Sequence, residues 1–472
     1  MNLNQTLQEK YPHLEISVLK LSEVQKDNES KRIDSEFFKK EYFDAMETMQ
    51  LNQVEYLGDN MKFNSRYSQP KYDETSKIKV INSQYIRNEY IDYENAKSGY
   101  GKIVPKESVL INATGVGTLG RVFINILDFD FSIDSHINVI VVKNKTYLNP
   151  YFLAIFLQSY YGQIQIIRYY SGTSGQIEIY PRDFNYFKIP IFPMEFQLEI
   201  QNLVKDSHKA LEESKELYKK AEETLYLELG LDPKNPLQSL LDSKTNNPTK
   251  SLNISIHTLK ESFLKTGRLD SEYYQSKYED IEKFIKSYPN GYDSFSNIIN
   301  NKDTNFTPKN NENYSYIELA NIGNNGNISE PISDLGKNLP TRARRIVSKG
   351  DVIISSIEGS LSSCALITQE FDKHLVSTGF FVLNSKLLNG ETLLVMFKSQ
   401  IFQEYLKKFP SGTILCAINK EELSKILIPK IDSTTQEKIA KYIQESFNLR
   451  KKSKQLLDNA KNKVEEQIQG KT

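Results

Sequence analysis

Short apolar runs, separated by glycine, asparagine and aspartate, recur along the chain in two sets. They are rich in β-branched and aromatic residues, which predicts strands of an antiparallel or mixed sheet. The first set covers residues 78–81, 108–111, 122–126 and 137–142, and the second covers 314–319, 351–355, 364–368 and 380–383. One helix is expected after each set, at 150–161 and at 391–409.

Two long segments have the periodicity of a helix. Residues 195–229 contain no proline or glycine before Gly230, which is typical of a C-terminal glycine cap. Their apolar residues fall at heptad spacing, and the same stripe returns 239 residues later. Small residues lie within both stripes, and these are Ser207, Ser214 and Ala221 and their equivalents Ser446, Ser453 and Ala460. The pattern predicts an antiparallel coiled coil of two helices, each roughly 50 Å long at about 1.5 Å per residue. The alternative is two separate surface helices, each covering its own domain.

The chain carries an internal duplication. Arg32–Tyr42 returns as Arg268–Tyr278, and Ser171-Gly-Thr returns as Ser411-Gly-Thr. A repeat this long indicates two copies of a whole domain. We therefore predict an α+β fold with two β-rich heads, separated by two long helices. The expected bounds are 1–193 for the first head, 194–235 for the central helix, 236–431 for the second head and 432–472 for the C-terminal helix.

Composition narrows the class of protein. The 472 residues include 60 Lys+Arg and 60 Asp+Glu, so the net charge is zero. No run approaches the roughly eighteen apolar residues that a membrane span needs, and the first residues do not form a signal peptide. Two cysteines, Cys364 and Cys416, and five scattered histidines exclude a disulfide scaffold and a Cys-rich zinc site. We expect a soluble protein of a reducing compartment, which means the cytoplasm.

No group of residues has the spacing of a catalytic site. Gly115–Gly120 matches the dinucleotide pattern Gly-x-Gly-x-x-Gly, but the residues after it are typical of a strand and not of a helix. A tight turn between strands is therefore predicted there. Asn149 followed by Pro150 is typical of a helix start. The chain is expected to be no enzyme by itself, and the alternative is an enzyme whose site has no familiar motif.

Charge is uneven along the chain. Residues 60–125 hold ten Lys/Arg against six Asp/Glu, whereas residues 195–229 hold five against nine, a contrast that fits heads that bind a polyanion. Cations and base-reading side chains give these DNA-binding candidates: Arg66, Tyr67, Lys71, Arg87, Asn88, Arg121, Arg168, Tyr169, Lys309, Asn321, Arg342, Arg344 and Arg345. The two Ser-Gly-Thr loops add Ser171, Thr173, Ser411 and Thr413. The alternatives are solvated surface charge for the cations and simple turns for the loops.

The order of these elements resembles the specificity subunit of type I restriction–modification systems, and the related subunit of some type IIB systems. The resemblance covers the whole chain and includes Ile189-Pro190 before Gln197 and Ile428-Pro429 before Gln436. It departs from the family where a Pro-Pro and a Glu-Gln pair are common, because this chain has Phe192-Pro193 and Thr435-Gln436.

The resemblance implies a division of labour. Each head would read one half of a split, asymmetric double-stranded DNA target, and the coiled coil would set the unread spacer. The subunit would do no chemistry and would bind no cofactor. It would dock two methyltransferase subunits, which use S-adenosylmethionine, and also translocase–nuclease subunits, which use ATP and Mg. The rival interpretation is a scaffold or adaptor with duplicated heads that does not bind DNA.

Overall fold

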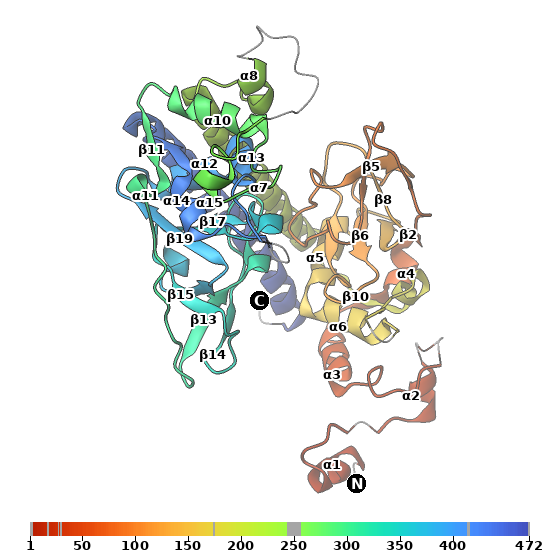
Figure 1. Ribbon diagram of the computed structural model, residues 1–472. Helices are drawn as coiled ribbons and strands as arrows, with labels where there is room; N and C mark the ends of the chain where they lie inside the picture. The colour runs from red at the N-terminus through yellow and green to blue at the C-terminus, as the bar shows by residue number, and fades with distance from the viewer. Residues whose placement is uncertain are drawn as a thin grey trace. The chain divides into compact units, whose positions relative to one another are not determined.

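The computed structural model describes residues 3–16, 18–26, 28, 31–172, 175–242, 256–412 and 416–470. The chain forms two compact units (Figure 1). Unit 1 consists of Met1–Leu211 with Arg450–Thr472, and unit 2 consists of Glu212–Leu449. Among the described residues, no helix has both the length and the apolar character that crossing a membrane requires.

Unit 1 is built on two four-stranded sheets and a short strand pair. The first sheet has the antiparallel order β2 (Met61–Arg66), β9 (Ile137–Val142), β6 (Val109–Asn112) and β7 (Val122–Ile124). The second has the order β3 (Lys71–Tyr72), β5 (Lys97–Tyr100), β4 (Lys79–Ile81) and β8 (Phe131–Ile133), with β4 and β8 parallel. Strands β1 (Val54–Tyr56) and β10 (Lys188–Pro190) pair with each other. Strands β6 and β7 are buried throughout, which explains their continuous apolar runs.

Unit 2 repeats this arrangement. One sheet has the order β12 (Ile299–Asn301), β19 (Phe380–Ser385), β16 (Val352–Ser355) and β17 (Cys364–Leu366). The other has the order β14 (Ile332–Leu335), β13 (Asn313–Ile317), β18 (Leu375–Ser377) and β15 (Ala343–Ile346), with β13 and β18 parallel. Strands β11 (Tyr292–Ser294) and β20 (Leu427–Pro429) form the short pair. The predicted α+β fold with duplicated heads is confirmed.

Short helices surround the sheets. In unit 1 these are α1 (Leu3–Lys10), α2 (Leu21–Gln25), α3 (Lys40–Met49), α4 (Leu57–Asn60), α5 (Pro150–Gln158), α6 (Tyr160–Tyr169) and the 3-10 helix η1 (Pro181–Tyr186). In unit 2 they are α8 (Pro236–Asp242), α9 (Phe263–Thr266), α10 (Ser276–Lys286), α11 (Phe295–Ile298), η2 (Leu319–Asn321), η3 (Glu358–Ser360), η4 (Gln369–Phe371), α12 (Gly390–Lys398), α13 (Gln400–Leu406) and α14 (Lys420–Lys425). Helix α5 packs on β6 and β7, and α12 packs on β16 and β17 (Figure 1).

The single helix predicted after each strand set is in fact two helices. Ser159 separates α5 from α6, and Ser399 separates α12 from α13, each with an extended backbone. In both places a glutamine side chain binds a carbonyl that the break leaves free. Gln163 Nε2 donates to the carbonyl of Leu157 at 2.7 Å, and Gln403 Nε2 donates to that of Phe397 at 2.6 Å. These side-chain bonds satisfy the helix end and keep the bend in place.

The two long helices pair in opposite directions. Helix α7 spans Met194–Glu228 and α15 spans Ser433–Ile468. Within unit 1 the hydroxyls of Ser207 and Ser453 lie 2.9 Å apart, and within unit 2 those of Ser214 and Ser446 lie 3.1 Å apart. Lower numbers on one helix meet higher numbers on the other in both units, so the predicted antiparallel coiled coil is confirmed. Gly230 follows α7 with φ +75, as expected of a left-handed cap.

A buried glutamine fixes the start of each long helix. The amide oxygen of Gln197 accepts the backbone N–H of Asn149 at 2.7 Å, and its Nε2 donates to the carbonyl of Phe192 at 2.8 Å. Gln436 makes the equivalent bonds to Asn389 at 2.9 Å and to the carbonyl of Ile431 at 2.9 Å. The glutamine that follows each Ile-Pro segment therefore ties its long helix to the loop before α5 or α12.

Candidate nucleic-acid interface

In unit 1 the two glycine-containing segments noted in the sequence meet at one set of loops. The turn Gly115–Gly120 joins β6 to β7, as predicted, and the backbone N–H of Gly115 donates to the carbonyl of Ile177 at 3.0 Å. Glu178 forms backbone bridges with both Thr114 and Ser171. The hydroxyl of Thr114 also lies 3.0 Å from Nδ1 of the exposed His136. We call residues 113–120, 134–137, 171–172 and 175–179 loop cluster 1.

Unit 2 contains the same arrangement. Ala417 forms backbone bridges with both Ile357 and Ser411, and the N–H of Glu358 donates to the carbonyl of Cys416 at 3.0 Å. The N–H of Ser356 donates to the carbonyl of Gly379 at 2.9 Å. We call residues 355–360, 377–379, 411–412 and 416–418 loop cluster 2. Thr173 and Thr413, the last residues of the two Ser-Gly-Thr loops, lie outside the described residues.

Glycine is required where the Ser-Gly loops turn. Gly172 has φ +111 and Gly412 has φ +132, values that side-chain-bearing residues rarely adopt. A Cβ at Gly172 would lie 2.0 Å from the carbonyl oxygen of Gln176. The loop therefore folds back tightly on itself, and its backbone passes close to the turn at 115–120. Because glycine has no side chain, a ligand can approach the backbone closely at Gly172 and Gly412.

Arg66 ends β2 beside loop cluster 1, Tyr67 follows it, and both side chains point into the protein. Arg66 forms an ion pair with Glu178 and donates to the carbonyl of Ile179. The Tyr67 ring is buried, and this burial raises the pKa of its hydroxyl. Exposed Lys102 lies over that ring, with Nζ 4.8 Å from the ring centroid. The sequence reasoning did not select Glu178, His136 or Lys102, because their roles depend on contacts between distant segments.

Arg87 and Arg121 bring two positive charges to one point. Both guanidinium groups donate to the carbonyl of Ile86, at 3.1 and 3.3 Å, and Arg121 also donates to the carbonyl of Gly117 at 2.8 Å. Burial, and then the neighbouring charge of Arg87, lower the pKa of Arg121. Among the described residues neither group has a carboxylate ion-pair partner. The pair adjoins the turn of loop cluster 1 through the bond from Arg121 to Gly117.

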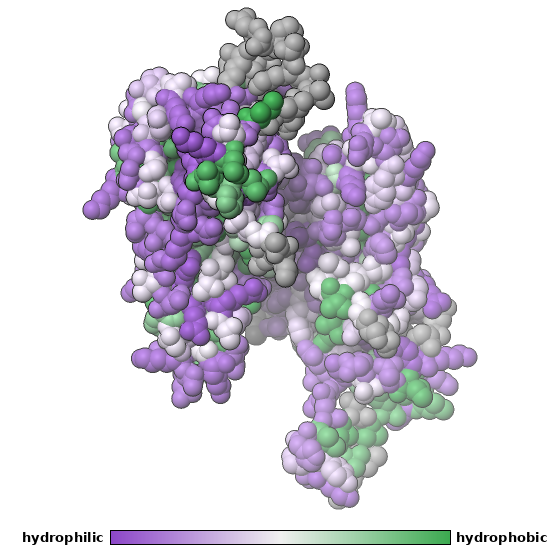
Figure 2. Space-filling model, viewed as in Figure 1, coloured by the Kyte–Doolittle hydropathy of each residue, from purple (hydrophilic) through white to green (hydrophobic). Residues whose placement is uncertain are grey.

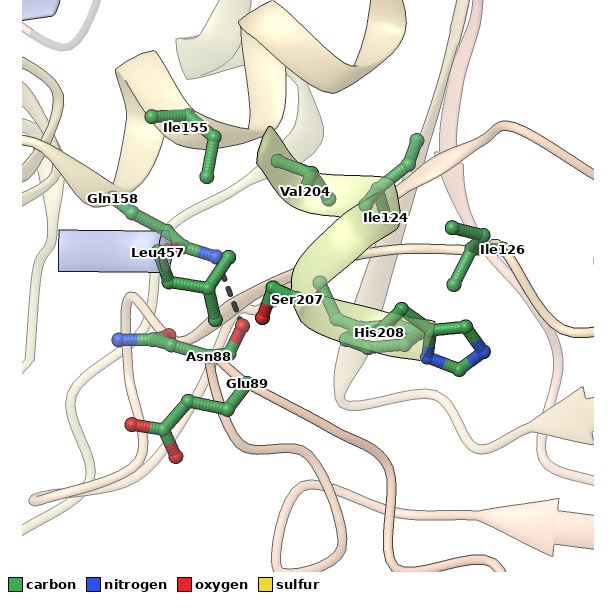
Figure 3. A pocket seen from close by; sticks show the side chains of 11 residues that line it. Asn88, Glu89, Ile124, Ile126, Ile155, Gln158, Val204, Ser207, His208 and Leu457 are labelled. Atoms are coloured by element: carbon green, nitrogen blue, oxygen red, sulfur yellow. Dashed lines mark hydrogen bonds between the residues drawn. The ribbon is translucent and has the colours of Figure 1, made fainter. Parts of the chain in front are cut away.

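Asn88 lies at a small cavity between the loop 87–90 and the long helices within unit 1 (Figure 3). The side-chain oxygen of Asn88 accepts the N–H of Val122 at 3.0 Å, and its carbonyl accepts a bond from Gln158 at 3.1 Å. The cavity offers about 20 Å³ to a water-sized molecule and has mainly apolar walls, with His208 at one side. No group of three metal-ligating side chains occurs here or elsewhere in the described part of the chain. The cavity has no catalytic constellation.

Arg168 and Tyr169 are both buried at the end of α6. The guanidinium carbon of Arg168 lies 3.7 Å from the ring centroid of Tyr42 and 4.2 Å from that of Phe37. Tyr169 packs edge-on against Phe37, with ring centroids 5.5 Å apart. These side chains contact the core of unit 1 and not its surface, so we do not place them in the proposed interface.

The remaining candidates lie on the second sheet of each unit or on its loops. Lys71 is exposed on β3, opposite Tyr100. Lys309 is exposed and pairs with Glu312 at 2.8 Å. Asn321 closes a turn, because its side chain accepts the N–H of Glu318 at 2.8 Å and donates to the carbonyl of Glu330 at 2.8 Å. Lys71 is therefore the freest of these three polar groups.

The arginines of 342–345 do not share one surface. Arg342 is exposed, and its carbonyl accepts the N–H of Thr378 in loop cluster 2 at 2.9 Å. Arg344 Nε donates to the carbonyl of Thr341 at 2.7 Å. Arg345 is half-buried, donates to the carbonyl of Phe380, and has its pKa lowered by that burial. Only the first two arginines remain available to an external anion.

The different positions of these arginines predict different effects on DNA binding and on stability. Arg342→Ala with Arg344→Ala should weaken DNA binding by the assembled complex several-fold at moderate salt and flatten its salt dependence, because phosphate contacts are lost. Arg345→Ala should instead lower the free energy of unfolding by about 1–3 kcal/mol, because it leaves a buried carbonyl unsatisfied. Urea unfolding and salt-dependent binding measure the two effects. Unchanged affinity in the double variant would remove Arg342 and Arg344 from the interface.

Comparison with known proteins matches the first head. Residues 44–223 match the family model described as the type I restriction modification DNA specificity domain. The chain is also 30% identical over 159 residues to the type I restriction enzyme HindI specificity subunit of Haemophilus influenzae. Residues 44–223 are therefore similar to the DNA specificity domain of type I restriction–modification systems. The match to the H. influenzae protein covers 33% of each chain, so it spans about a third of that relative's length.

Solved structures of similar proteins also match. The type I restriction–modification S subunit from M. genitalium is 13% identical, with a TM-score of 0.43, and the match covers 87% of this chain and 95% of that one. The HsdS subunit from Thermoanaerobacter tengcongensis is 14% identical, with a TM-score of 0.27, and the match covers 89% and 97% of the two chains.

Proposed function

We propose that this chain is the non-catalytic DNA sequence-recognition subunit of a restriction–modification complex. The observation that carries the proposal is that the head that matches the DNA specificity domain occurs twice with the same sheet order. Each head, 1–193 and 236–431, reads one half of a bipartite target. The helices 194–235 and 432–472 hold the heads apart and set the unread spacer between the two halves.

Loop clusters 1 and 2 are the parts of the heads that we propose to face the DNA. Tight glycine turns let the backbone approach phosphates, and cations lie beside them, namely the half-buried Arg87 and Arg121 in unit 1 and the exposed Arg342 in unit 2. The outer strands and loops differ between the two copies. Arg87 follows the bridge residue Ile86, whereas Gly323 follows the equivalent bridge residue Ile322 in the second copy. Different side chains at equivalent places favour different half-sites and hence an asymmetric target.

The partners follow from the same proposal. Two methyltransferase subunits bind the coiled coil and supply S-adenosylmethionine chemistry, and translocase–nuclease subunits with ATP and Mg join for cleavage. Exposed apolar residues lie near the start of both heads and support a partner present twice. Leu21 is 71% exposed and Leu259 is 62% exposed, and each is the second residue of an equivalent turn, closed by Glu23 and by Glu261. Apolar residues also gather on the surface around α1 and α2 (Figure 2). The complex acts in the cytoplasm, where the cellular DNA is.

A map of modified bases in the source genome, with and without this gene, tests the proposal. A split, asymmetric motif should lose its adenine methylation when the gene is deleted and regain it on complementation. The same map yields both half-sites and the spacer length. Unchanged methylation, together with failure to co-purify a methyltransferase subunit, would favour a scaffold that does not bind DNA.

A further inference from the structure

An arginine at the start of each head makes similar bonds in both copies, to an aspartate two residues later and to carbonyls before the Ser-Gly loop. In unit 1, Arg32 donates from Nε and Nη2 to the two carboxylate oxygens of Asp34, both at 2.7 Å. Its remaining nitrogen, Nη1, donates to the carbonyl of Arg168 at 3.1 Å and to that of Tyr170 at 2.7 Å. The guanidinium group therefore links the lead-in segment of the head to the end of α6.

Unit 2 repeats this link with different neighbours. Arg268 donates to Asp270 at 2.7 and 2.9 Å. It also donates to the carbonyls of Lys408 at 3.4 Å, Phe409 at 3.2 Å and Pro410 at 2.8 Å, of which Lys408 and Pro410 are equivalent to Arg168 and Tyr170. The residues that accept these bonds have different side chains in the two copies. The arginine nevertheless binds their backbone carbonyls in both. The repeated element is thus an arginine fork that recognises the path of the backbone.

The bound carbonyls lie immediately before the Ser-Gly loops. Tyr170 precedes Ser171, and Pro410 precedes Ser411. The far side of each loop is already held, by the bridge from Ser171 to Glu178 and by the one from Ser411 to Ala417. The arginine therefore fixes the remaining end, at the point where the chain leaves its helix and enters the loop cluster.

An aromatic ring between two cations supports the fork in each copy. In unit 1, the guanidinium carbons of Arg32 and Arg168 lie 5.1 and 4.2 Å from the centroid of Phe37. In unit 2, Arg268 and Lys408 lie 4.5 and 4.9 Å from the centroid of Tyr273. The rings hold the guanidinium plane in place, and the carboxylates of Asp34 and Asp270 orient it. The fork lowers the pKa of Asp34, for which the hydrogen bond to Arg32 is the main cause.

We propose that Arg32 and Arg268 are positioning residues for target recognition, each of which sets the Ser-Gly loop of its own head without touching DNA. This inference rests on the proposed function, because it assigns the loop clusters to the DNA-facing surface. A planar fork with five donors can serve one carboxylate and two carbonyls together, and a lysine ammonium cannot. Each arginine should therefore influence one half-site only.

The test uses the full chain with its partner subunits and a map of modified bases. Arg32→Lys should lower methylation at least tenfold, or relax base choice, in the half-site read by the first head. Arg268→Lys should do the same in the other half-site. Asp34→Asn and Asp270→Asn should produce smaller changes in the same halves. These variants replace the lysine variants in the test if a lysine variant fails to fold. Arg182→Lys is the matched control, because that side chain is 59% exposed and should leave the motif unchanged.

The readouts separate positioning from plain stability. Thermal unfolding and recovery of the assembled complex report stability, and the base composition of each half-site reports positioning. A lower unfolding temperature with an unaltered motif, or equal changes in both half-sites, would overturn the inference. A wild-type complex that methylates no bipartite motif would instead overturn the proposed function, so the two failures are distinguishable.

Discussion

Exchange of residues 60–185 for the corresponding segment of another specificity subunit is expected to change one half of the methylated motif and to leave the other half intact. Each unit has hydrophobic clusters of its own. Those of unit 1 use residues 37–204 and 457–468, and those of unit 2 use residues 218–443. No core side chain of unit 2 is replaced in the exchange, so its loop cluster should keep its shape.

The exchanged segment begins and ends just inside the β1–β10 strand pair, which closes the head like a clasp and is called its clasp below. Strands β1 and β10 pair outside the exchanged segment, and the N–H of Leu57 donates to the carbonyl of Phe187 at 2.7 Å. The incoming segment must fit Gly58, because a Cβ there would lie 3.0 Å from the carbonyl oxygen of Asn185.

The reciprocal chimera is the control for this experiment. Exchange of residues 298–424, between the strands of the β11–β20 clasp, should change the other half of the motif. The measurement is a modified-base map for each chimera beside the wild type. A change of both halves in either chimera would mean that the heads do not read DNA independently.

The sequence revealed the buried strands better than the exposed ones. Strand β9 has the bounds predicted for 137–142, and β6 and β7 lie within one or two residues of their predictions. These strands are covered on both faces, so they read as uninterrupted apolar runs. Strands β2, β3 and β5 were not predicted. They carry exposed polar residues such as Lys62, Lys71 and Lys97, which hide the strand pattern.

The orientation of individual cations was beyond the sequence. Arg168 and Arg87 have the same chemistry, yet Arg168 is buried against Phe37 and Tyr42 from a segment more than a hundred residues away. Arg345 turns inward because Phe380 offers its carbonyl. Such outcomes depend on tertiary contacts, which periodicity does not encode. The duplicated motif that begins at Arg32 and Arg268 was visible in the sequence, but its role required the backbone of α6 and α13.

The first head carries more basic than acidic residues, but only one of the two long helices carries more acidic than basic residues. Helix α7 is acidic, but α15 carries eight Lys/Arg against five Asp/Glu. Pairing therefore brings opposite charges together, as in the 2.8 Å ion pair between Lys463 and Glu199 within unit 1. The charge difference between the two helices favours their pairing with each other, and the acidic residues of 195–229 are no evidence about DNA by themselves.

Insertion of one heptad into both long helices is expected to lower methylation of the native motif more than tenfold. The insertions belong between Ser207 and Ser214 and between Ser446 and Ser453, so that both serine pairs survive. Seven residues are nearly two helical turns, so the apolar stripe keeps its face. They add about 10 Å of helix at about 1.5 Å per residue, which corresponds to roughly three base pairs at about 3.4 Å each. The native half-sites then lie too close together for the two heads.

The residual methylation should fall on sites whose spacer is about three base pairs longer, and it should be weak. Three extra base pairs turn the DNA by roughly 100°, since B-DNA repeats every 10–10.5 base pairs or so, whereas a heptad turns the helix by only about 20°. An insertion in α15 alone should cost more, because it takes one serine pair out of register and reduces recovery of the complex. The same seven residues placed after Lys234, beyond the end of α7, should leave the motif as it is. An intact complex that carries both helix insertions and still methylates the native motif with its native spacer would show that something other than the length of the coiled coil sets the distance between the half-sites.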